Sequence, residues 1–125
     1  MARMTDIHRR EFEVLRRAFL AEVPGKIRAI RDAAEDAERR GYPRDAVENL
    51  LHLTHRLLGS AAIFGLGVVS DASRALEQQV TTLCRQGETP REGPGRELCG
   101  LVQGLESAWS RASSADELGS SERDA

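Results

Sequence analysis

Residues 50–65 read LLHLTHRLLGSAAIFG, and this stretch decides how the chain folds. The pattern predicts a helix that is apolar on most sides, with a polar strip that carries His52, His55 and Gly59. At about 100° per residue, the helical wheel places the main apolar stripe roughly opposite His55. Such a stripe is the core face of an amphipathic helix, so the His55 side chain is expected to point outward. The stripe consists of Leu50, Leu53, Leu57 and Phe64.

A second apolar group surrounds His55 on the predicted outer face of this helix. Its three members are Leu51, Leu58 and Ala62, which lie within about 60° of His55 on the wheel. A small apolar surface beside an outward imidazole suits a transient encounter with another protein. We expect this surface, with the polar residues at its rim, to bind a partner. The expected partner-binding residues are Leu51, His52, Leu58, Gly59 and Ala62.

Gly59 is unusual because a glycine inside a helix costs about 1 kcal/mol relative to alanine. It follows His55 by one turn on the same face. Either a neighbouring helix packs closely at this point, or the missing side chain keeps the approach to His55 clear for another molecule. Because the wheel places Gly59 on the outward face, we favour the second interpretation.

The rest of the chain also shows helical periodicity, with Gly and Pro between the periodic stretches. Pro24 removes a backbone donor, so a first helix is expected to end near Ala21 or to kink there. The short link Gly65–Gly67 favours an antiparallel neighbour for the central helix. The sequence therefore predicts an all-α fold, an antiparallel four-helix bundle with an additional N-terminal helix. Residues 1–112 would form the bundle, and residues 113–125 a frayed tail.

Composition limits the possible functions. A chain of 125 residues suits one domain, and its net charge of −2 gives no basic footprint for nucleic acid. It contains no apolar run long enough for a membrane span and no secretory signal. Cys84 and Cys99 lack the spacing of a metal or redox motif, so we expect them to be reduced and buried. These features predict a cytoplasmic, monomeric protein that binds neither nucleic acid nor membranes.

Residues 55–65, HRLLGSAAIFG, followed by Leu76-Glu77, resemble the signature of the histidine phosphotransfer (HPt) domain of two-component phosphorelays. That signature is a His, a Gly-Ser-Ala run that begins four residues later, a Gly ten residues after the His, and a Leu-Glu or Leu-Gln pair on the next helix. All of these features are in register here. The family often has Lys three residues after the His, where this chain has Leu58.

The resemblance implies that His55 is the phosphoacceptor and that Glu77 orients its ring. It implies a phosphohistidine carrier with no autonomous kinase activity. The partners would be response-regulator receiver domains, a histidine kinase, or both. The carrier needs no cofactor of its own, since Mg²⁺ is expected on the receiver domain. Because Leu58 replaces the lysine, Arg56 and Arg74 are candidates to support the phosphoryl oxygens.

Two other functions remain open from the residues. The same bundle could dock on a kinase or receiver without being phosphorylated, as an inhibitor. His52 and His55, three residues apart, could share a metal ion, although no third ligand is evident and we expect no metal site. An enzyme in its own right is not supported, because the chain has no nucleotide-binding glycine loop and no paired catalytic carboxylates.

Overall fold

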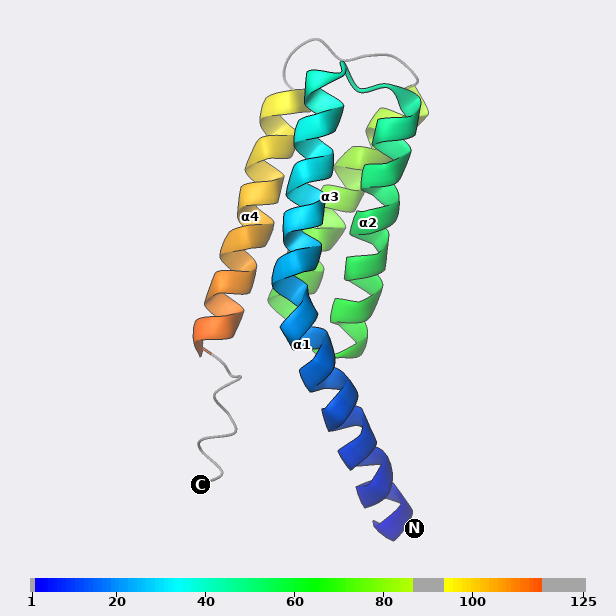
Figure 1. Ribbon diagram of the computed structural model, residues 1–125, viewed down its shortest axis with the longest axis vertical. Helices are drawn as coiled ribbons and strands as arrows, with labels where there is room; N and C mark the ends of the chain where they lie inside the picture. The colour runs from blue at the N-terminus through cyan, green and yellow to red at the C-terminus, as the bar shows by residue number, and fades with distance from the viewer. Residues whose placement is uncertain (1, 87–93, 116–125) are drawn as a thin grey trace.

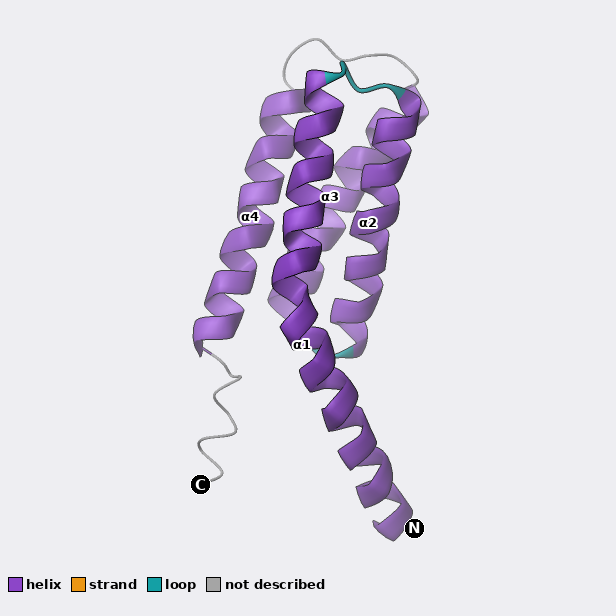
Figure 2. Ribbon diagram, viewed as in Figure 1, coloured by secondary structure: helices purple, strands orange, loops and turns teal. Residues whose placement is uncertain are grey.

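The computed structural model describes residues 2–86 and 94–115, and every secondary-structure element within them is a helix (Figure 2). The helices are α1 (Ala2–Arg39), α2 (Arg44–Ile63), α3 (Gly67–Gln86) and α4 (Pro94–Ala115). Each helix packs against the next one in sequence, and α4 packs back against α1 (Figure 1). The prediction of an all-α antiparallel four-helix bundle is confirmed.

Aliphatic side chains from all four helices fill the interior. Ile30, Leu50, Leu76 and Leu105, one from each helix, have no exposed surface. Burying a side chain of this size stabilises the fold by about 1.5–3 kcal/mol. The core is therefore built from interlocking aliphatic residues, as the sparse aromatic content of the sequence requires.

Glycine in the left-handed conformation ends α2. Gly65 has φ 76°, and its N–H donates to the carbonyl oxygen of Ala62 at 3.3 Å. The next residue, Leu66, donates to Ala61 at 2.9 Å, which completes a Schellman motif. The following link is short, so α3 turns back beside α2. This return places Glu77 of α3 opposite His55 of α2.

α1 continues through Pro24 as one 38-residue helix. Of the two alternatives, an end near Ala21 was therefore wrong, and the described residues include no separate N-terminal helix. α1 instead changes direction where it leaves the bundle (Figure 1). An interior proline costs roughly 3 kcal/mol, but Val23, Ile27 and Ile30 on the flanking turns are almost fully buried. Their packing outweighs the missing hydrogen bond and keeps both halves in one helix.

The N-terminal part of α1 projects beyond the bundle (Figure 1). Residues 6–15 are all exposed. The projection is attached at its base, where the ring centroids of Phe12 and Phe19 lie 5.2 and 5.1 Å from that of Phe64. Arg16 Nε also donates to the Phe64 carbonyl oxygen at 3.0 Å. α1 is thus joined to the corner between α2 and α3.

Three smaller expectations can be compared with the structure. Cys84 and Cys99 are free thiols, but Cys84 is half-buried and Cys99 is exposed, so the expected burial was wrong. α4 continues to Ala115, and residues 116–125 of the predicted tail lie outside the described residues. None of the described helices combines the length and the apolar character that a membrane crossing needs.

Candidate functional site

His55 lies in the middle of α2, and its side chain is 71 % exposed. Glu77, from the middle of α3, is 23 % exposed and meets the imidazole from the side. The distance from His55 Nδ1 to Glu77 Oε2 is 2.5 Å. The two residues for which the resemblance implies phosphoacceptance and ring orientation are therefore in direct contact.

This contact determines what the ring can do. An ionised carboxylate only accepts hydrogen bonds, so Nδ1 carries the proton and its N–H donates a hydrogen bond to Glu77 Oε2. In the neutral ring the lone pair then belongs to Nε2, the nitrogen that is not engaged by Glu77. A fixed ring with a free, exposed nitrogen is the arrangement that a nitrogen nucleophile requires.

The structure places the five expected partner-binding residues differently. His52, Gly59 and Ala62 are exposed around His55, and Leu51 is partly buried against the core. Leu58 is only 9 % exposed and belongs to the interior. Its expected place on the docking surface was wrong, because it lies about 40° around the helix from the fully buried Thr54. The outer surface beside His55 is thus smaller and more polar than predicted.

Gly59 has open space in front of it. A Cβ atom added there would meet nothing within 4 Å apart from its own helix backbone and chain neighbours. Close packing against a neighbouring helix therefore does not explain this glycine. The open space agrees with the second interpretation, in which Gly59 leaves the approach to His55 unobstructed.

The two candidate arginines lie on opposite sides of His55. Arg74 is exposed on α3, one turn before Glu77, and pairs with Asp71 at 3.6 Å. Arg56 faces α1 and lines a groove together with Lys26. Sequence reasoning missed Lys26, because nothing in the local pattern of α1 indicates which residue of α2 it lies beside. Three cationic side chains, Arg56, Arg74 and Lys26, thus flank the His55 face.

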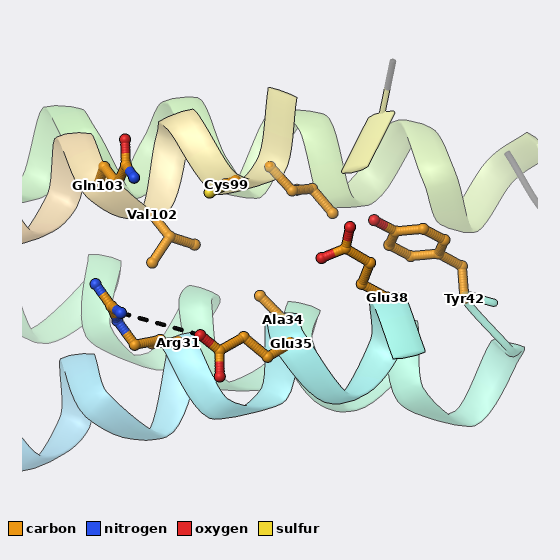
Figure 3. Close-up of a pocket in the computed structure, with 9 residues that line it drawn as sticks. Arg31, Ala34, Glu35, Glu38, Tyr42, Cys99, Val102 and Gln103 are labelled. Atoms are coloured by element: carbon orange, nitrogen blue, oxygen red, sulfur yellow. Dashed lines mark ion pairs between the residues drawn. The ribbon is translucent and has the colours of Figure 1, made fainter. Parts of the chain in front are cut away.

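A separate hollow lies between α1 and α4 (Figure 3). Arg31 and Glu35 face each other across one turn at its edge, at 3.9 Å. Tyr42 lies at one end, where burial and the nearby charge of Glu38 raise the pKa of its hydroxyl. Neither His55 nor Glu77 lines this hollow. It is therefore distinct from the His55 site.

No group of three or more His, Cys, Asp or Glu side chains within residues 2–86 and 94–115 is placed to hold a metal ion. In the comparison with known families, the model described as Hpt domain matches residues 14–117. Neither the curated proteins nor the solved structures gave a match. The matched range contains the whole His55 site and most of the bundle.

Proposed function

The chain belongs to the Hpt domain family and so takes part in phosphorelay signalling, and we propose that His55 is the residue that carries the phosphoryl group. In this proposal His55 accepts the group from the aspartyl phosphate of a receiver domain or from a histidine kinase. It then passes the group to the aspartate of a receiver domain. The exchange takes place in the cytoplasm, as the resemblance to phosphorelay carriers implies.

One observation supports this proposal most strongly, namely the contact between His55 Nδ1 and Glu77 Oε2 at 2.5 Å. This contact holds the proton on Nδ1 and directs the Nε2 lone pair away from Glu77. Because the His55 side chain is 71 % exposed, a phosphoryl donor can approach Nε2 in line. Phosphoryl transfer depends mainly on such positioning and on electrostatic support.

The transfer of the phosphoryl group needs no reactant other than the donor and His55. The Nε2 lone pair attacks phosphorus, an Nε2–P bond forms, and the bond from phosphorus to the aspartyl oxygen breaks. The aspartate of the donor leaves as a carboxylate. Glu77 stabilises the positive charge that develops on the ring, because Nδ1 keeps its proton. The reverse step delivers the group to a second aspartate.

In this proposal both the receiver domain and this chain supply positive charge that stabilises the phosphoryl oxygens during transfer. The receiver domain holds Mg²⁺ near its aspartate, so this chain needs no metal of its own. Arg74 is the candidate arginine on the Glu77 side of His55, since it lies one turn before Glu77 on α3. Arg56 lies toward α1 beside Lys26. Guanidinium groups bind phosphoryl oxygens strongly, so either arginine can take the place of the missing lysine.

A labelling experiment tests the proposal. The chain is incubated with receiver domains carrying a radiolabelled aspartyl phosphate in Mg²⁺, and separately with phosphoramidate, a small donor that needs no docking surface. We expect acid-labile, alkali-stable label on the wild-type chain, as phosphohistidine requires. His55→Ala should remove the label. His52→Ala is the matched control in the phosphoramidate arm, which needs no docking surface, because it changes an exposed histidine one turn away, and there it should retain the label.

The outcomes separate the carrier from the docking alternative. Label on His55→Ala, or no label on the folded wild-type chain from either donor, would refute the carrier. A receiver that bound the unlabelled chain tightly would then support a docking or inhibitory bundle. The absence of a cation at position 58, where Leu58 is buried, is the feature that favours this second function.

A further inference from the structure

Exposed large apolar residues gather at one end of the molecule. Four of them lie on the projecting part of α1, and the other two lie at the corner between α2 and α3, to which that projection is joined. Among the described residues these six are the only large hydrophobic side chains that are this exposed. They are Ile7, Phe12, Val14, Leu15, Ile63 and Val68.

The projecting helix has two faces with different surroundings. Phe12 and Arg16 face the bundle and contact Phe64. Ile7 and Val14 lie about 140–180° around the helix from these two residues, so they point away from the bundle. Ile7 is 52 % exposed and Val14 68 %. These two residues form a second, narrow apolar stripe that no other described part of the chain covers, and Leu15 lies about 80–100° around the helix from them, toward Phe12.

The uncovered stripe can gain by contact with a partner, because such a contact removes apolar surface from water. Residues 6–15 are all exposed, although they continue a 38-residue helix that is anchored in the bundle further along. Most of this segment also precedes residues 14–117, which match the family. Most of the projection therefore lies outside the matched range, and the bundle does not cover its second stripe.

Charges beside the stripe indicate what the partner is. Asp6, Arg10, Glu13 and Arg17 follow one another at spacings of four, three and four residues, so they lie on one flank of the stripe. Their charges alternate in sign along this flank. In an antiparallel pair of identical helices, a flank meets its own copy in the reverse direction. Asp6 then meets Arg17, and Arg10 meets Glu13, so each charge meets its opposite.

We propose that two copies of this chain associate through residues 6–17 of α1, packed antiparallel about a two-fold axis between Glu11 and Phe12. The apolar stripes of the two helices pack together, and the flanking charges form four ion pairs across the interface. The pairing also brings the first turn of the partner helix level with Arg17. That level is the α2–α3 corner, but the partner helix lies on the opposite side of α1, so Ile63 and Val68 stay outside this interface.

The same geometry predicts that the dimer is weak. Twelve helical residues span only about 18 Å, so the interface is smaller than that of a stable complex. Glu11 lies within the stripe beside the axis, where it meets the Glu11 side chain of the other copy. We therefore expect a reversible dimer at micromolar to millimolar concentration, in place of the monomer that the sequence suggested. His55, in the middle of α2, stays accessible in both copies.

Sedimentation equilibrium of the full chain tests this inference, with a 13.8 kDa monomer as reference. Arg10→Glu and Glu13→Arg should each weaken the dimer on the order of tenfold, because each places like charges at two symmetry-related contacts. The double variant R10E/E13R restores opposite charges and should recover wild-type association. Glu11→Ala should strengthen the dimer, and Val14→Glu should abolish it.

The matched control is R44E/E48R, a charge exchange at another exposed i,i+4 pair, whose Nε–Oε2 distance is 3.0 Å. It should leave the association unchanged. Circular dichroism checks that every variant stays folded. A wild-type chain that is monomeric up to millimolar concentration would overturn the inference. So would a dimer that neither single reversal weakens, an exchange that fails to restore association, or assemblies larger than two.

Discussion

The reactivity of the His55 side chain depends on Glu77, which lies 22 positions further along the chain. Glu77 fixes the proton on Nδ1 of His55 and holds the ring in one orientation. Glu77→Ala should therefore lower the rate of His55 labelling from phosphoramidate by roughly tenfold, which corresponds to the loss of one charge-assisted hydrogen bond. Glu77→Gln keeps an acceptor oxygen and should retain more activity than the alanine variant. Equal rates for all three proteins would show that ring orientation is unimportant.

The sequence predicted the pair His55 and Glu77 but not the burial of Leu58. A helical wheel gives the direction of each residue from one helix, so it correctly placed His55 outside. How far a neighbouring helix covers an intermediate direction depends on the packing of the whole bundle. Leu58 occupies such a direction, and it is 9 % exposed. Lys26 was missed for a related reason, since its position beside Arg56 depends on how α1 meets α2.

At the scale of one element, two glycines of the α2 region are expected to respond oppositely to the same substitution. Gly59→Ala places a methyl group in open space and should stabilise the helix by about 0.5–1 kcal/mol. Gly65→Ala forces a side chain into the left-handed conformation at φ 76° and should destabilise by about 1–2 kcal/mol. Thermal unfolding followed by circular dichroism measures both effects. If Gly59→Ala destabilised the fold, the added methyl group would have to clash with a neighbouring atom, which would contradict the open space at this position.

The course of α1 shows where local rules stop being sufficient. Pro24 correctly indicated a missing hydrogen bond, yet the helix does not end there. Local propensity cannot measure the burial of Val23 and Ile30 on either side, which are both fully buried. The periodicity of the first residues likewise predicted a helix. It could not show that Ile7 and Val14 extend beyond the bundle, because that depends on where α2 ends.

At the scale of the whole molecule, the attachment of α4 to the bundle can be attributed to particular interactions. Arg31 of α1 donates two hydrogen bonds to Glu106 of α4, at 2.5 Å each. This pair raises the pKa of Arg31, a change that lies far above neutral pH and gives stability no pH dependence there. Both side chains are substantially exposed, and exposed ion pairs contribute little. Beside them, Leu105 has no exposed surface.

Neighbouring substitutions in α4 should therefore have very different effects. Leu105→Ala leaves a cavity and should cost roughly 2–5 kcal/mol, a large part of the roughly 5–15 kcal/mol that stabilises a typical domain. Glu106→Gln should shift the midpoint of thermal unfolding by about 2 °C or less. Urea unfolding measures the loss of free energy for both variants, and thermal unfolding followed by circular dichroism measures the shift of the midpoint. If Glu106→Gln were the more damaging change, the ion pair would hold α4 in place. The expected order instead means that aliphatic packing in the core holds α4 in the bundle more strongly than its ion pair with α1 does.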